Sequence, residues 1–165
     1  MPPSSPVAVV AAGPEDFDRI AELTVRVYID GGLANEGYTP ELADVAGRAA
    51  RSELLVARDG DGQLVGSVAL VLEGDFGEVN QSDDEAAFRM LVVEPSAQGR
   101  GIGELLVTTC LDRARTAGKR RMVLSTGTRM TAAQRLYERL GFTRLPERDW
   151  SPVPGIDLLV YSREL

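Results

Sequence analysis

The segment QGRGIGE, residues 98–104, places three glycines within five positions, and it constrains the fold more than any other part of the chain. It follows an apolar run at residues 90–93 and leads into a stretch with helical periodicity. A glycine in a helix costs about 1 kcal/mol relative to alanine, so three at a helix start need a reason. The first turn of a helix presents unpaired N–H groups and the positive end of its dipole, and glycine lets a phosphate approach the backbone. The segment therefore predicts an anion site between a strand and a helix.

Two common phosphate loops do not fit this segment. A nucleoside triphosphate loop has the pattern GxxxxGK[ST], and no Lys-Ser or Lys-Thr pair follows these glycines. A dinucleotide fold needs GxGxxG directly after its first strand and an acid near the end of the next strand. Here the spacing is GxGxG, the loop lies five residues beyond the strand, and the next strand ends in Ser125 and Thr126. A nicotinamide-dependent oxidoreductase is therefore disfavoured, and binding of NADH would reveal one.

The rest of the chain predicts strands and helices in the order βααβββαβαββ. Apolar residues at Phe17, Ile20, Leu23 and Val27 indicate a helix between Pro14 and the glycines at 31–32. Asp-Gly pairs at 59–62 indicate an antiparallel hairpin. This order predicts an α+β fold, in which a mixed, largely antiparallel sheet of about seven strands is flanked by helices on both faces. The remaining expected helices are 39–49, 101–118 and 131–140, and the expected strands are 7–12, 53–58, 63–72, 86–93, 122–126, 142–145 and 156–163, with a loop at 73–85.

Composition excludes several classes of protein. With 165 residues, 44% of them hydrophobic, the chain is long enough for one domain with a sizeable core. The formal net charge of −7 argues against a nucleic-acid-binding protein, whose affinity needs clustered cations. There is no histidine and one cysteine, Cys110, so we expect no metal site and no intramolecular disulfide. Neither a secretory signal nor a run of ~18 apolar residues is present, so we expect a cytoplasmic protein that does not enter a membrane.

Two motifs resemble those of one enzyme family. The segment 98–103 is similar to the Gln/Arg-x-x-Gly-x-Gly/Ala loop of the GNAT superfamily of N-acetyltransferases. The segment TAAQRLYERLGF is similar to the family's later A-x-x-x-Y-x-x-x-G-F pattern, with Ala133, Tyr137, Gly141 and Phe142 in register. The resemblance covers at least residues 86–145, and it implies a single N-acetyltransferase domain over residues 1–165 with the GNAT-like acyl-CoA N-acyltransferase fold.

The resemblance implies that acetyl-CoA is the co-substrate. Backbone N–H groups of residues 99–104 would bind its pyrophosphate, and residues 91–93 would pair with the pantetheine arm like an added strand. One N–H of that strand would face the thioester oxygen, as in an oxyanion hole. Met130 stands where the family often has an asparagine that contacts the cofactor. The implied cofactor-binding residues are Leu91, Val92, Val93, Gln98, Gly99, Arg100, Gly101, Ile102, Gly103, Glu104, Met130, Ala133 and Tyr137.

Two residues are candidates for catalysis. Tyr137 matches the family position that donates a proton to the departing thiolate, although it is also compatible with a core aromatic residue. Some members place a glutamate base where this chain has Ala87, and Glu85 lies two residues earlier on the same face of the expected strand. Glu85 is therefore a candidate general base, or else one member of a solvated acidic loop.

Several further groups have two interpretations each. Cys110 lies on the apolar stripe of its helix, which favours a buried residue over a reactive thiol. Tyr28, Tyr38 and Trp150 are compatible with an acceptor pocket or with plain packing. The cations Arg113, Arg115, Lys119, Arg120 and Arg121 suit the end of the helix dipole, or else the 3′-phosphate of CoA. The acids Glu73, Asp75, Glu78, Asp83, Asp84 and Glu85 form a solvated loop, or else attract a cationic amine.

These observations together predict an acetyl-CoA-dependent N-acetyltransferase. The acetyl group would pass from acetyl-CoA to a primary amine by direct attack in a ternary complex, and we expect a small-molecule acceptor. A peptide N-terminus or a lysine side chain is the alternative acceptor. A CoA-binding module without catalysis is the alternative of another class, because Met130 and Ala87 depart from the family pattern. The sequence is also compatible with a homodimer.

Overall fold

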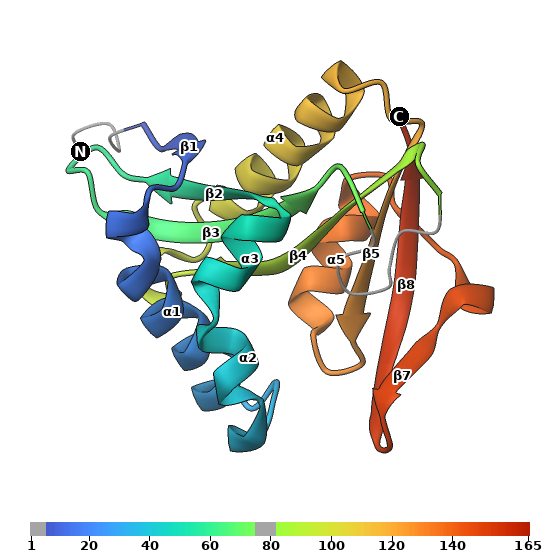
Figure 1. Cartoon of the computed structure of the whole chain (residues 1–165), viewed down its shortest axis with the longest axis horizontal. Helices are drawn as coiled ribbons and strands as arrows, with labels where there is room; N and C mark the ends of the chain where they lie inside the picture. The colour runs from blue at the N-terminus through green and yellow to red at the C-terminus, as the bar shows by residue number, and fades with distance from the viewer. Residues whose placement is uncertain (1–5, 75–81) are drawn as a thin grey trace.

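The computed structural model describes residues 6–74 and 82–165 (Figure 1). The strands in these residues form one eight-stranded sheet in the order β1-β2-β3-β4-β5-β8-β6, with β7 paired to β8. Within this part of the chain only the β4–β5 pair is parallel, which confirms the predicted α+β fold with a largely antiparallel sheet. The strands are β1 (Ala8–Ala11), β2 (Glu53–Arg58), β3 (Leu64–Val71), β4 (Glu85–Val93), β5 (Arg121–Gly127), β6 (Thr143–Arg144), β7 (Trp150–Val153) and β8 (Ile156–Glu164).

Helices cover both faces of the sheet, as predicted. On one face lie α1 (Phe17–Val25), which continues into a π-helical turn (Arg26–Asp30), α2 (Thr39–Ala43) and α3 (Val45–Arg51). On the other face lie α4 (Ile102–Thr116) and α5 (Thr131–Arg139). The single helix expected at 39–49 is wrong, because the backbone of Asp44 leaves the helical region and its side chain accepts a hydrogen bond from Gly47 N at 3.1 Å. Asp44 thereby caps α3 and ends α2.

The core explains why the central strands are apolar on both sides. Every residue of β3 is buried, as expected of a strand covered by helices on both faces. Its alternate residues face opposite ways: Leu70 packs in the cluster that includes α4 and α5, and Ala69 packs in the cluster that includes α1 and α3. Cys110 of α4 is fully buried in the first cluster, and burial raises the pKa of its thiol to about 12. The structure therefore supports a packing role for this cysteine.

Strands β4 and β5 separate in the middle of the sheet. They pair only at residues 85–87 of β4 and 121–123 of β5. Beyond this point β4 continues against β3 and β5 continues against β8, so the two strands diverge, as Figure 1 shows. The facing edges of β4 and β5 are therefore not hydrogen-bonded to each other beyond this point, and a space opens between the two strands.

Three local predictions need correction. Strand β7 was missed, since Pro152 argues against a strand, although a proline is tolerated in an edge strand such as this one. Strand β6 is two residues long where residues 142–145 were expected. Part of the expected loop at 73–85 lies outside the described residues, including Asp75 and Glu78, and β4 begins at Glu85.

The described residues contain neither a membrane-spanning helix nor a cluster of metal ligands. None of the helices there is both long and apolar enough to cross a bilayer. In residues 6–74 and 82–165 there is also no group of three or more acidic, cysteine or histidine side chains placed to hold a metal ion.

Candidate active site

Glycine is required at the three positions of the loop for different structural reasons. Gly99 and Gly101 have φ angles of 83° and 77°, in the left-handed region that favours glycine. A Cβ atom at either position would meet nothing within 4 Å, so the backbone conformation, and not crowding, requires glycine there. Gly103 lies in the first turn of α4, where a Cβ atom would be 3.3 Å from the Leu136 side chain of α5. The loop is therefore bent by two glycines and packed closely by the third.

The N-terminus of α4 is open. Its N-cap residue is Gly101, so no side chain caps the helix. Leu105 N donates to Gly101 O at 3.0 Å, and helix geometry leaves the N–H groups of the preceding turn without an acceptor inside the helix. Residues 98–101 are exposed, whereas Ile102 is buried and anchors the turn. These donors and the dipole of a 15-residue helix suit an anion.

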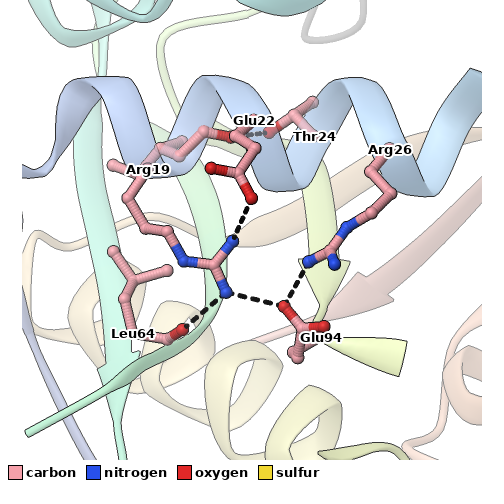
Figure 2. Close-up of polar contacts among 7 residues, drawn as sticks. Arg19, Glu22, Thr24, Arg26, Leu64 and Glu94 are labelled. Carbon is pink, nitrogen blue, oxygen red and sulfur yellow. Dashed lines mark hydrogen bonds and ion pairs between the residues drawn. The ribbon is translucent and has the colours of Figure 1, made fainter. Parts of the chain in front are cut away.

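An ion-pair cluster fixes the start of this loop. Glu94 directly follows β4, and its Oε2 accepts hydrogen bonds from Arg19 at 2.7 Å and Arg26 at 2.5 Å (Figure 2). Burial alone would raise the pKa of Glu94, but the two guanidinium groups lower it below its usual value. Glu94 N also donates to Val65 O at 2.8 Å. The loop therefore leaves the sheet from a point held by both α1 and β3.

A β-bulge in β4 lies where the strand leaves β5. The register shifts between Ser67, which faces Val92, and Ala69, which faces Arg89, so Met90 and Leu91 together oppose one residue of β3. Met90 has a φ angle of 55°, the only positive value among the non-glycine residues described. A bulge re-aims the side chains and backbone groups around it, and such strain gathers at functional sites.

A cavity of about 450 Å³ fills the space between β4 and β5. Its walls come from both strands, the segment after α1, α5 with its N-cap residue Met130, and the β7–β8 hairpin. The described lining residues include one cation, Arg89, and no acid. They are Tyr28, Leu33, Ala34, Asn35, Gly37, Tyr38, Phe88, Arg89, Met90, Leu91, Ser125, Thr126, Gly127, Met130, Tyr137, Pro152, Ile156 and Leu158.

Tyr137 belongs to both the core and the cavity. Its ring lies 5.7 Å from that of Phe88, 5.9 Å from Phe142 and 6.2 Å from Tyr161, and only 4% of the residue is exposed. Burial raises the pKa of its phenol far above the usual value, and the nearby Tyr28 adds to this shift. The aromatic cluster therefore holds a protonated phenol in the cavity wall.

The cavity contains some of the predicted site residues and lacks others. Leu91, Met130 and Tyr137 line it, together with Tyr28 and Tyr38. Val92 packs under α1 and α3, while Val93 and Ala133 pack against the core beside α4. Gln98, Gly99, Arg100, Gly101 and Glu104 are exposed around the open helix end, and Trp150 is not among the lining residues.

Sequence reasoning missed the contribution of the β7–β8 hairpin. Pro152, Ile156 and Leu158 line the cavity from the C-terminal end of the chain. The sequence offered one signal, the apolar residue Ile156 at the start of the last expected strand. In the structure this residue stays 40% exposed. Its place in the cavity wall depends on the pairing of β5 with β8, which no local pattern reveals.

The predicted role of Glu85 as a general base is not supported by its position. Glu85 lies at the paired end of β4 and β5, and it does not line the cavity. It is 6% exposed, and both of its oxygens accept hydrogen bonds from Arg148 at 2.9 Å. The Nη1 atom of Arg121 lies 3.5 Å from Oε2 of Glu85. A bidentate pair of this kind anchors the segment before β7 to the sheet.

Replacing Glu85 with glutamine is expected to lower the free energy of unfolding by roughly 3 kcal/mol, since it removes the negative charge from a buried bidentate pair with Arg148. The pH profile of kcat should not change. Asp84→Asn is the control, because Asp84 pairs with Arg120 at 3.2 Å in an exposed position and its loss should cost under about 1 kcal/mol. Thermal unfolding and pH–rate profiles measure both effects. A Glu85→Gln protein of normal stability that has lost turnover would restore the general-base role.

The basic cluster after α4 does not reach the cofactor loop. Lys119 Nζ donates to Asp83 O at 2.6 Å, and Arg120 pairs with Asp84. These residues follow the far end of a 15-residue helix, roughly 22 Å from its open N-terminus. This distance does not support Lys119 and Arg120 as ligands of the CoA 3′-phosphate, and both residues have partners at residues 83–84.

Comparisons with known proteins agree with this geometry. Residues 17–142 match the model of the acetyltransferase (GNAT) family. The chain is 39% identical over 90 residues to mycothiol acetyltransferase of Beutenbergia cavernae, covering 54% of this chain and 27% of that protein. It is 35% identical over 94 residues to L-methionine sulfoximine/L-methionine sulfone acetyltransferase of Salmonella typhimurium, covering 49% and 53%. The matches thus span about a quarter to a half of these relatives.

Two solved structures share the fold. An acetyltransferase of the GNAT family from Staphylococcus aureus has a TM-score of 0.77 at 15% identity, covering 97% of this chain and 99% of that one. The yncA protein of Salmonella typhimurium, solved with its cofactor acetyl-CoA, has a TM-score of 0.67 at 23% identity, covering 96% and 94%.

Proposed function

Because the chain belongs to the GNAT family of acetyltransferases, we propose that it transfers the acetyl group of acetyl-CoA to a primary amine by direct attack in a ternary complex. One observation carries the proposal. The open, glycine-capped end of α4 is joined by the loop of residues 94–101 to the strand that forms one wall of the 450 Å³ cavity. A phosphate site and a reaction chamber therefore lie along one continuous strand and loop.

The residues present fit acetyl-CoA. The N–H groups of residues 101–104 would hold its pyrophosphate, since Gly99 and Gly101 leave open space beside the helix end. The edge of β4 at residues 91–93, which β5 has left, would accept the pantetheine arm as an added strand. At the bulge, a backbone N–H beside Met90 would donate to the thioester oxygen as negative charge develops there.

Tyr137 would act as the acid. Its phenol is protonated at neutral pH and lines the cavity, which supports a role in protonating the departing thiolate. The chain has no histidine, and the described lining residues include no carboxylate, so the amine would lose its proton to water. The reactive species is then the neutral amine, whose fraction rises with pH.

We expect a small-molecule acceptor. The names of the two relatives refer to mycothiol and to L-methionine sulfoximine, and both are small molecules. Walls from five parts of the chain surround the cavity, and its volume of about 450 Å³ has to hold the acetyl end of the co-substrate as well. We therefore favour a small amine over a peptide N-terminus or a lysine side chain as the acceptor.

Acetyl transfer can be tested by incubating the protein with acetyl-CoA and a panel of small primary amines and short peptides. Thiol release should depend on a small amine, and mass spectrometry should find the acetylated product. Binding of acetyl-CoA without thiol release from any acceptor would indicate an inactive module. A rise in melting temperature with NADH in place of acetyl-CoA would indicate an oxidoreductase, since a ligand at 100 times its Kd stabilises by about 2.7 kcal/mol.

A further inference from the structure

The mouth of the cavity lies between two elements that are far apart in the sequence. The lining residues Phe88, Thr126 and Tyr137 are buried and form the inner end of the cavity. The lining residues that are exposed come from the segment before α2 and from the β7–β8 hairpin, and they are Asn35, Gly37, Tyr38, Pro152 and Ile156. Helix α2 and the tip of this hairpin both extend to the lower edge of the molecule in Figure 1. The mouth therefore opens at that edge.

Large apolar side chains gather at this mouth. Three exposed large hydrophobic residues are described, Val10, Tyr38 and Ile156. Tyr38 and Ile156 line the cavity, one on each side of its mouth, and they are 37% and 40% exposed. A single exposed apolar residue such as Val10 needs no explanation, whereas apolar side chains that gather at an opening are typical of a binding site. The mouth therefore suits an apolar part of a ligand.

The lining behind the mouth is also largely apolar. Leu33 and Leu158 contribute from the two sides, and Met90 and Met130 contribute from the bulge and from the N-cap of α5. A methionine side chain is flexible and adapts to the shape of an apolar partner. Burial raises the pKa of the phenol of Tyr28, which lines the same cavity, to about 12, and the nearby Tyr38 adds to this shift. Water therefore hydrates this lining poorly.

The co-substrate does not account for the mouth. None of residues 98–104, all of which are described, lines the cavity, and Leu91 is the lining residue nearest to them in the sequence. Phosphates bound at the glycine loop would therefore lie beyond the Leu91 end of the cavity, and the acetyl group would reach the bulge at Met90. The space between the bulge and the mouth is left for the acceptor.

We propose that the acceptor is a small primary amine with an apolar body, whose amino group reaches the bulge while its hydrocarbon part lies between Tyr38 and Ile156. This assignment rests on the proposed function. The nitrogen of the neutral amine forms a bond to the thioester carbon, and the C–S bond breaks. The amine loses one proton to water, and Tyr137 protonates the sulfur and recovers a proton from water. The products are an N-alkylacetamide and the CoA thiol.

A series of unbranched amines from n-propylamine to n-hexylamine tests the assignment, since its members differ only in hydrocarbon length. The value of kcat/KM should rise roughly fourfold for each added methylene, the factor expected for burying one CH₂ group. 5-Aminopentan-1-ol carries a hydroxyl where n-hexylamine carries a methyl group. After correction for its neutral fraction, its kcat/KM should be roughly 10- to 100-fold lower than that of n-hexylamine. N-hexylacetamide, titrated by calorimetry with CoA present, should bind more tightly than N-propylacetamide by the same factor per methylene.

Variants on the two sides of the mouth locate the effect. Ile156→Asn and Tyr38→Ser should each lower kcat/KM for n-hexylamine more than for n-propylamine, so that the increase per methylene falls to about twofold or less. Val10→Asn is the matched control, because Val10 is also an apolar strand residue that is 40% exposed, and it does not line the cavity. This control should leave the whole series unchanged.

The outcomes separate the two proposals. A flat amine series, equal use of n-hexylamine and 5-aminopentan-1-ol, or an increase per methylene that survives in both variants would overturn the apolar acceptor and leave acetyl transfer intact. A flat amine series together with a preference for hexanoyl-CoA over acetyl-CoA would also overturn it, because the apolar lining would then hold the acyl chain. Absence of thiol release with every amine would overturn the proposed function. In that case the calorimetric comparison of the two amides still decides the apolar site, because it needs no turnover.

Discussion

Replacing Tyr137 with phenylalanine is expected to lower kcat by roughly 10²- to 10⁴-fold, the contribution typical of a positioned acid. Phenylalanine keeps the ring that packs against Phe88, Phe142 and Tyr161, and it removes only the phenol. Because the phenol acts only as the thiolate departs, kcat and kcat/KM should fall together. Acetyl-CoA affinity and the melting temperature should change little.

Tyr161→Phe is the control for this prediction. Tyr161 belongs to the same aromatic cluster, but it is not among the cavity-lining residues, and its hydroxyl donates to Glu138 at 3.2 Å. Its loss should leave kcat within about threefold of the parent. If Tyr137→Phe also stays within that range across the pH profile, with chemistry rate-limiting, Tyr137 is a core aromatic residue and water protonates the thiolate.

Replacing Gly101 with valine is expected to weaken acetyl-CoA binding by roughly 100-fold or more. A β-branched residue at a φ of 77° costs about 1–3 kcal/mol of strain, and its side chain would occupy the space that the pyrophosphate needs. If the backbone relaxes to relieve the strain, the N–H groups move away from the phosphate. If the backbone keeps its conformation, the valine side chain keeps the phosphate away from these N–H groups. Calorimetry with acetyl-CoA on the folded variant measures the loss.

Gly118→Val separates strain from ligand contact. Gly118 follows the other end of α4 with a φ of 78°, and a Cβ atom there would also meet nothing within 4 Å. Both substitutions should lower the melting temperature by similar amounts, whereas only Gly101→Val should weaken acetyl-CoA binding. Equal affinities for acetyl-CoA in the two folded variants would contradict the assignment of the loop.

Local sequence patterns predicted those parts of the molecule that local physics controls. The hairpin around residues 59–62 follows from its Asp-Gly turns, and the apolar stripe that includes Cys110 placed α4 correctly against the sheet. The glycine loop was recognisable because positive φ angles leave few residue choices. These features need only neighbouring residues, so a sequence alone is enough to find them.

Long-range pairings determined what the sequence could not show. Glu85 looked like a member of an acidic loop, but its partner Arg148 lies 63 residues away. The cavity exists because β5 leaves β4 to pair with β8, which brings Ile156 and Leu158 to the site. The faces that Val92 and Val93 occupy depend on a bulge, since one extra residue in β4 reverses which face the following side chains occupy.

A crystal structure of the protein with acetyl-CoA bound tests the central claim most directly. The pyrophosphate oxygens should lie within hydrogen-bond distance of the N–H groups of residues 101–104, and the pantetheine should run along β4 beside residues 91–93. The thioester should lie at the bulge of Met90, with its sulfur facing the Tyr137 hydroxyl. Acetyl-CoA bound anywhere other than between β4 and β5, or a thioester out of reach of Tyr137, would contradict the proposed site.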